Sequence, residues 1–126
     1  MSACILIVDD NPVNLKLARS VLEIEGHKVD AAIDAESALE YLHETIPDLI
    51  LMDIALPGMD GLSLTRKLKA DPRWRTIPVI ALTAFAMLSD EKRALDAGCD
   101  GYMTKPIDTR QLPLTVLSHL VGNGAS

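Results

Sequence analysis

DLILMDI at residues 48–54 is the stretch that decides the fold. Its apolar residues run without interruption from Leu49 to Met52, and such a run is typical of a strand that is covered on both faces. Asp53 then interrupts the apolar run, at a place where an unpaired carboxylate would be costly to bury. The stretch therefore predicts a buried strand that ends in a carboxylate with a partner.

Strand-like and helix-like segments alternate along the rest of the chain. We expect further strands at four stretches, namely CILIV (4–8), KVDAAI (28–33), PVIALTA (78–84) and GYMTK (101–105). We expect the intervening helices from Pro12 to before Gly26, over Ala35–Ile46, around Leu64–Leu68, up to Gly98, and from about Asp108 to Val121. Strict alternation predicts an α/β fold with a parallel sheet and helices on both faces.

Length and charge limit the classes of protein that this chain can represent. With 126 residues, we expect one domain over 1–126, with a core at about 3–121 and a polar tail at 122–126. The net charge of −6 argues against binding of nucleic acid, which requires clustered Lys and Arg. The apolar runs are far shorter than a membrane span, and no basic leader begins the sequence. We therefore expect a cytoplasmic protein without membrane contacts.

Single residues outside the strands lead to two smaller expectations. Cys4 and Cys99 show no metal-ligand or disulfide spacing, and the scattered histidines His27, His43 and His119 are expected to be surface or packing residues, not ligands. Pro113 falls where the last helix should already be hydrogen-bonded, so we expect that helix to start late or to kink.

Polar residues end four of the five expected strands: Asp9-Asp10, Asp53, Thr83 and Lys105. The carboxyl ends of parallel strands meet at one edge of the sheet, where ligands of such folds bind. Three carboxylates at about 4 Å repel by on the order of 4 kcal/mol per pair at an effective dielectric near 20, so the cluster requires a cation. Mg²⁺ suits that role because it is a hard cation that accepts carboxylate ligands.

The predicted edge of the sheet thus combines a carboxylate nucleophile, a metal, a lysine and a hydroxyl. Phosphoryl transfer to an aspartate requires this set of groups. Each of these residues taken alone could be a turn, cap or surface residue. Their convergence on one edge carries the prediction.

Four segments resemble the receiver domains of response regulators from two-component systems: ILIVDDN (5–11), DLILMDIALPGMDG (48–61), VIALTA (79–84) and YMTKP (102–106). The resemblance implies a doubly wound, five-stranded sheet in the order 2-1-3-4-5, as in flavodoxin and CheY. TAFAM at 83–87, together with the length, further resembles single-domain regulators of the DivK type.

The resemblance also implies a role for each residue of the site. Asp53 would accept the phosphoryl group, while Asp9 and Asp10 would hold Mg²⁺ together with Asp53 and the backbone carbonyl of Ala55. Lys105 would bind the phosphate.

Further positions of the resemblance concern the response to phosphorylation. Thr83 and Tyr102 match the switch pair of the family, and the Lys105–Pro106 peptide bond would be cis. Phe85 and Met87 are candidates for the surface that binds a downstream protein, although a core role for one of them is equally open.

The resemblance implies two kinds of protein partner. A histidine kinase or a histidine phosphotransfer protein would approach past Asn11, Asn14, Leu17 and Pro106. A downstream protein target would receive the signal by contact, since no output domain follows Val121. A receiver that is part of a hybrid histidine kinase is an alternative origin for the same sequence.

Two other functional classes compete with this interpretation. A phosphatase of the haloacid dehalogenase type needs a second Asp two positions after the nucleophile, where this chain has Ala55, and a nucleophile after the first strand. A flavodoxin-like FMN carrier needs a glycine- and hydroxyl-rich loop after the first strand, where Asp9 and Asp10 would repel phosphate. Neither class fits the residues at these positions.

Overall fold

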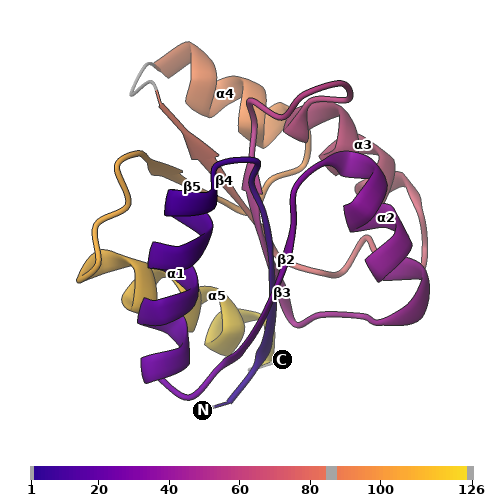
Figure 1. The fold of residues 1–126 in the computed structure, drawn as a ribbon. Coiled ribbons are helices and arrows are strands. Elements are labelled where there is room, and N and C mark those ends of the chain that lie inside the picture. Colours follow the sequence, from indigo (N-terminus) through magenta and orange to yellow (C-terminus); the bar gives the residue numbers. More distant parts are fainter. Residues whose placement is uncertain (1, 85–87, 125–126) are drawn as a thin grey trace.

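The computed structural model describes residues 2–84 and 88–124, without the side chains of Leu88 and of residues 121–124. Strands and helices alternate strictly over these residues (Figure 1). The strands are β1 (Cys4–Val8), β2 (Lys28–Ala32), β3 (Leu49–Asp53), β4 (Val79–Thr83) and β5 (Gly101–Thr104). The helices are α1 (Pro12–Ile24), α2 (Ala35–Glu44), α3 (Gly61–Ala70), α4 (Leu88–Asp96) and α5 (Gln111–Gly124).

The strands form a parallel sheet in the order β2-β1-β3-β4-β5, which confirms the expected fold class. Helices α1 and α5 cover one face of this sheet, and α2, α3 and α4 cover the other (Figure 1). The sheet is therefore buried on both sides, as its apolar strands require.

Strand β3 shows how the two layers are built. Leu49 and Leu51 pack toward α1 and α5, whereas Ile50 and Met52 pack toward α2, α3 and α4. All four side chains are fully buried because successive strand residues point to opposite faces. A central strand of this kind has no solvent-facing side, so only its end can present Asp53 to a ligand.

Helix α1 begins directly after the acidic residues that follow β1. The Asn11 side chain accepts hydrogen bonds from the backbone N–H groups of Val13 at 2.9 Å and Asn14 at 3.2 Å. Pro12 occupies the first helical position, where a missing N–H has no cost. Because the helix is capped at Asn11, the connection from β1 to α1 is short. Asp9 and Asp10 therefore lie at the end of the strand.

Helix α5 differs from the expectation at both ends. It begins at Gln111 and not at Asp108, whose side chain instead accepts the N–H of Gln111 at 3.2 Å. Pro113 is thus in the first helical turn, where N–H groups lack intrahelical acceptors, so the expected late start is confirmed. The expected end at Val121 is wrong, because the backbone remains helical to Gly124: extending a formed helix is far easier than starting one.

The other helices differ by a few residues from the expected ranges. Helix α2 ends at Glu44, because the extended backbone of Thr45 already leads toward Pro47. Helix α3 is longer than expected and begins at Gly61 after an Asp60 cap. Among residues 2–84 and 88–124, no helix combines the length and the apolar character that crossing a membrane requires.

Candidate functional site

Two carboxylates are brought together by the pairing of β1 with β3. The register joins Val8 to Met52, so the next residues, Asp9 and Asp53, lie side by side at the carboxyl ends of the two strands. Asp10 follows at once, and one carboxylate oxygen from each of the three aspartates lies within 4.8 Å of the others. The predicted acidic cluster is thus present at the carboxyl edge of the sheet.

Asp9 is completely buried, and its two oxygens have different surroundings. Oδ1 accepts the backbone N–H of Asn11 at 2.9 Å. Oδ2 has no hydrogen-bond donor in suitable geometry among the described residues and makes an ion pair with Lys105 Nζ at 3.2 Å. Burial raises the pKa of Asp9, and the negative charge of Asp53 raises it further. The charged form of Asp9 is therefore held in an unfavourable environment.

Asp53 is almost fully buried, and both of its oxygens accept hydrogen bonds. The backbone N–H of Ala55 donates to Oδ1 at 2.9 Å, and Lys105 Nζ donates to Oδ2 at 2.9 Å. Burial alone would lower the pKa of Lys105, but the hydrogen bond to Asp53 and the charges of Asp53 and Asp9 outweigh it and raise that pKa. The lysine therefore stays charged and partly offsets the repulsion between the two carboxylates.

Thr83 and Tyr102 occupy the other two strands that border the site. Thr83 is buried at the end of β4, and the register joins Ala81, two residues earlier, to Tyr102 on β5. Because residues two apart on a strand share a face, Thr83 and Tyr102 lie diagonally on the same side of the sheet. Burial raises the pKa of Tyr102, and the charges of Asp90 and Glu91 on α4 raise it further. Tyr102 thus connects the end of the sheet with α4.

The remaining predicted residues are distributed around this edge. The Lys105–Pro106 bond is cis, as expected, and Pro106 is exposed beside the site. Asn11 is exposed and Asn14 is half-buried on the first turn of α1. Phe85 and Met87 lie outside the described residues.

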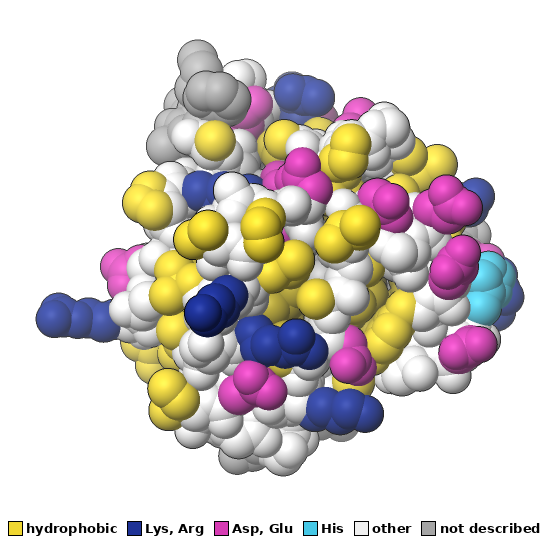
Figure 2. All heavy atoms as spheres, in the orientation of Figure 1, with side chains coloured by type: hydrophobic (Ala, Val, Ile, Leu, Met, Phe, Trp, Pro, Cys, Tyr) yellow, Lys and Arg dark blue, Asp and Glu magenta, His cyan; other side chains and the backbone are white. Residues whose placement is uncertain are grey.

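One exposed apolar surface near the site was only partly predicted from the sequence, which named Leu17 but not Val13. Pro12, Val13, Lys16, Leu17 and Ser20 line a shallow groove along α1, over which Figure 2 shows hydrophobic and basic side chains close together. Val13 is 71% exposed and Leu17 is 37% exposed. The sequence signal was available, because Val13 does not fall on the stripe of Leu15, Ala18 and Leu22 that faces the sheet.

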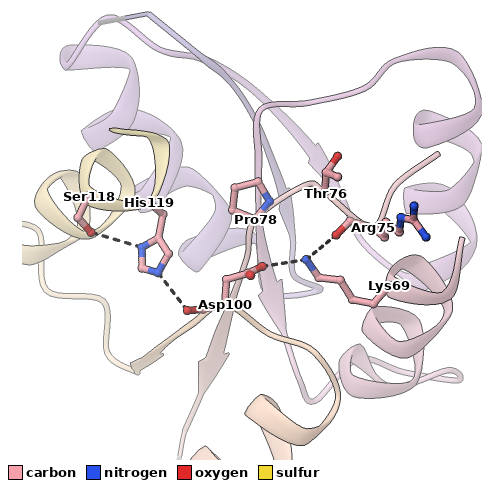
Figure 3. A pocket seen from close by; sticks show the side chains of 7 residues that line it. All are labelled: Lys69, Arg75, Thr76, Pro78, Asp100, Ser118 and His119. Atoms are coloured by element: carbon pink, nitrogen blue, oxygen red, sulfur yellow. Dashed lines mark hydrogen bonds and ion pairs between the residues drawn. The ribbon is translucent and has the colours of Figure 1, made fainter. Parts of the chain in front are cut away.

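A cavity at the opposite edge of the sheet, before β4 and β5 begin, is lined by Lys69 and Asp100, which bond to each other (Figure 3). Lys69 Nζ donates to the carbonyl oxygens of Arg75 at 3.2 Å and Ile77 at 2.8 Å and to Asp100 Oδ2 at 2.8 Å. Asp100 Oδ2 also accepts the N–H of Val79 at 2.8 Å. An ammonium group has three N–H donors, so Lys69 has none left for a ligand. This network joins α3 to the starts of β4 and β5.

The histidines agree with the expected packing roles. His27 is buried, and its Nδ1 accepts the N–H of Ala3 at 3.1 Å. His43 packs edge-on against Trp74. His119 interacts with the backbone carbonyl of Asp100 at 3.2 Å. Within the described part of the chain, the group suited to hold a metal ion consists of aspartates alone.

Comparison with known proteins supports the same interpretation as this geometry. Residues 5–117 match the family model of the response regulator receiver domain. The polar-differentiation response regulator DivK of Brucella abortus is 44% identical over 120 residues, which cover 95% of this chain and 98% of that protein.

Solved structures agree as well. The signal receiver domain of a signal transduction histidine kinase from Syntrophus aciditrophicus superimposes with a TM-score of 0.90 at 37% identity, covering 98% of this chain and 94% of that one. The receiver domain of a sensor histidine kinase from Pseudomonas aeruginosa, with a magnesium ion coordinated in its active site cleft, has a TM-score of 0.86 at 35% identity, covering 95% and 98%.

The match covers nearly the whole chain, and the parallel sheet carries an acidic cluster and a lysine at its carboxyl edge. The chain therefore belongs to the response regulator receiver domain family, the phosphoryl-accepting receivers of two-component signalling, and is similar to the DivK regulators.

Proposed function

We propose that Asp53 accepts a phosphoryl group from the phosphohistidine of a histidine kinase or a histidine phosphotransfer protein. The observation that carries this proposal is the hydrogen bond of 2.9 Å between Lys105 Nζ and the nearly buried Asp53 carboxylate, beside the buried Asp9. A lysine in this position offsets negative charge beside the acceptor and can move to an incoming phosphoryl oxygen. We further propose that residues 1–126 act as one receiver unit in the cytoplasm, with the alternative that a hybrid kinase carries it.

The residues present fit a magnesium ion. Asp9 Oδ2 is buried, has no well-aligned hydrogen-bond donor among the described residues and lies 3.2 Å from Lys105 Nζ. One carboxylate oxygen of Asp9 lies within 4.8 Å of one each from Asp10 and Asp53. A hard cation would satisfy this oxygen and relieve the repulsion between the charges. Asp9, Asp10, Asp53 and the backbone carbonyl of Ala55 would hold the ion, which would offset negative charge on the transferring phosphoryl oxygens.

The chain's own groups account for the remaining chemistry. A carboxylate oxygen of Asp53 forms the new bond to phosphorus while the bond from phosphorus to the donor nitrogen breaks, and the imidazole retains that electron pair. Lys105 then follows the negative charge from the carboxylate to the phosphoryl group. The hydroxyl of Thr83, buried at the end of β4, donates a hydrogen bond to a phosphoryl oxygen of the product.

A simple labelling experiment tests this function. Purified protein is incubated with acetyl phosphate and Mg²⁺, and the intact mass is measured. We expect a gain of one phosphoryl group that is lost at alkaline pH, as an acyl phosphate should be, and no gain when EDTA is present. Labelling that persists with the metal removed would contradict the proposal.

The proposed output is a rearrangement of Thr83 and Tyr102. When Thr83 moves toward the phosphoryl group, Tyr102 can turn inward over Ala81, whose small side chain lies beside it in the register. This movement would change the face formed by α4, β5 and α5, where Phe85 and Met87 would contribute to binding of a downstream protein.

We expect beryllofluoride, a phosphoryl mimic, to shift the amide resonances of residues 83–90 and 102 strongly. Residues 26–30, far from this face, serve as the internal control. Unchanged resonances at 83–90 and 102, in a protein that demonstrably binds beryllofluoride, would contradict the switch.

The groove on α1 leads to a prediction about the phosphoryl donor. A donor protein must approach past Asn11, Asn14, Leu17 and Pro106, whereas acetyl phosphate can diffuse into the site without touching α1. We expect Leu17→Asp to slow transfer from a phosphohistidine donor at least about tenfold, because about 1.4 kcal/mol of lost apolar contact suffices for that factor. Labelling by acetyl phosphate should be unchanged.

Ile24→Asp is the matched control for this experiment. Ile24 is also apolar and is 82% exposed, but it lies at the end of α1 farthest from the site. This substitution should change neither the rate of transfer from the phosphohistidine donor nor the rate of labelling by acetyl phosphate. Equal losses with both donors in the Leu17 variant would mean that the site itself was damaged.

The lifetime of the phosphorylated state should be long. Hydrolysis needs a water in line with the bond that breaks, and the exposed side chain at position 55 is a methyl group that cannot orient one. Position 85, the other candidate for this role, lies outside the described residues. We expect Ala55→Asn to accelerate decay of the purified phosphoprotein several-fold, since positioning alone can lower a barrier by about 1 kcal/mol. Ala55→Leu, which adds bulk without a polar group, should not accelerate it.

A further inference from the structure

Gly61 packs directly against the backbone of the proposed acceptor. It is the first residue of α3, is buried, and donates its N–H to the carbonyl oxygen of Ile54 at 3.3 Å. A Cβ atom at this position would collide with the carbonyl oxygen of Asp53 and would lie 2.8 Å from Ile54 Cα. The obstructing atoms are backbone and not the movable end of a side chain, so any larger residue must displace the peptide between Asp53 and Ile54.

This peptide connects the groups that matter for phosphoryl transfer. The Asp53 carboxylate precedes it, and the Ala55 carbonyl, a proposed metal ligand, follows one residue later. The loop is anchored in addition by Leu56, which is buried in the core on the side of α2, α3 and α4. The loop thus begins after Asp53 and is anchored by Leu56. At its end, Gly61 packs against the backbone of Asp53 and Ile54, where the loop began.

We propose that Gly61 is a positioning residue, whose lack of a side chain lets α3 press against the Asp53–Ile54 peptide and so sets the Asp53 carboxylate and the Ala55 carbonyl for Mg²⁺ and phosphoryl transfer. This inference rests on the proposed function of Asp53. It assigns to the start of α3 a role in the chemistry that no side chain there could perform.

Gly58 provides a matched control within the same loop. Its φ of +72° is one that side chains rarely adopt, but a Cβ there would meet nothing within 4 Å. Gly58→Ala therefore strains the loop without pushing on Asp53. Gly61→Ala pushes on Asp53 without demanding an unusual backbone angle.

The experiment measures the rate of labelling by acetyl phosphate as a function of Mg²⁺ concentration for wild type, Gly61→Ala and Gly58→Ala, with urea unfolding of each. We expect Gly61→Ala to raise the Mg²⁺ concentration for half-maximal rate at least about tenfold and to lower the maximal rate, since misplacement by about 1 Å can cost a hundredfold. Gly58→Ala should stay within about twofold of wild type for both quantities, even if it unfolds at lower urea. Equal kinetics for the two variants would overturn the inference.

A second measurement does not depend on the variant being folded. In the wild-type protein, the amide resonance of Gly61 should shift during a Mg²⁺ titration with the same midpoint as the labelling rate, while those of Gly26 and Gly98 stay in place. A Gly61 resonance that does not respond would overturn the inference. A wild-type protein that binds Mg²⁺ but is never labelled would instead contradict the proposed function. The role of Gly61 would then still be tested by comparing the Mg²⁺ concentrations for half-maximal binding of wild type and Gly61→Ala.

Discussion

Asp53→Asn is expected to abolish labelling by acetyl phosphate in the presence of Mg²⁺, with a rate at least about a thousandfold below wild type, or about 4 kcal/mol in the barrier. The amide has the size and shape of the carboxylate, so the fold should persist. It carries no negative charge, however, and its nitrogen cannot attack phosphorus. Incorporation is measured by intact mass and by phosphate-affinity electrophoresis.

Asp60→Asn is the control for this prediction. Asp60 lies in the loop after β3 and caps α3 by accepting the N–H of Ser63 at 2.8 Å, a role that Asn fills equally well. This variant should be labelled like wild type. If Asp53→Asn retained wild-type labelling, the acceptor would have to be another residue.

Asp9→Asn is expected to stabilise the metal-free protein while it weakens binding of Mg²⁺ at least about tenfold. The buried carboxylate of Asp9 lies beside that of Asp53, and the two carboxylates share the single positive charge of Lys105. Replacement by the neutral amide removes the repulsion between the two carboxylates, and we expect a gain of about 0.5–2 kcal/mol in unfolding free energy, the size that single stabilising substitutions commonly give. The Asn11 N–H keeps its acceptor, since the side-chain carbonyl of Asn can take the place of Oδ1.

Urea unfolding with and without Mg²⁺ measures both effects of Asp9→Asn. A site-bound ion stabilises by about 2.7 kcal/mol at a hundred times its Kd, and a tenfold loss of affinity at the same concentration removes about half of that. Asp10→Asn is the control, because Asp10 is exposed: it should weaken Mg²⁺ binding without stabilising the metal-free protein. A destabilised Asp9→Asn variant would show that Lys105 already compensates the charge.

The pH dependence of the metal-free protein gives a further check on Asp9. Its pKa is raised in the folded state by burial and by Asp53, so the ionised carboxylate destabilises the fold at neutral pH. This penalty disappears as the pH falls through the raised pKa toward the ordinary value of 3.8. The stability advantage of Asp9→Asn should therefore be full near pH 7 and shrink on acidification.

Local patterns in the sequence were sufficient for the elements and for the nature of the site. The apolar run before Asp53 requires a strand that is buried on both faces. The alternation of such runs with helices predicts a parallel sheet. Strand ends of a parallel sheet share one edge, so Asp9, Asp53, Thr83 and Lys105 could be placed together without coordinates. The strand order itself came from the family resemblance, because local patterns do not say which strands pair.

Tertiary packing decided the features that depend on contacts between distant residues. The register of β1 on β3 places Asp9 beside Asp53, and the reach of Lys105 across β4 joins residues 52 positions apart. The surroundings of a buried oxygen such as Asp9 Oδ2, which has an ion pair with Lys105 but no well-aligned donor among the described residues, depend on every atom around it. Gly61 is the clearest case. In the sequence it could be an ordinary glycine at the start of a helix, and only the packing of the loop against the Asp53 backbone shows why a side chain is excluded there.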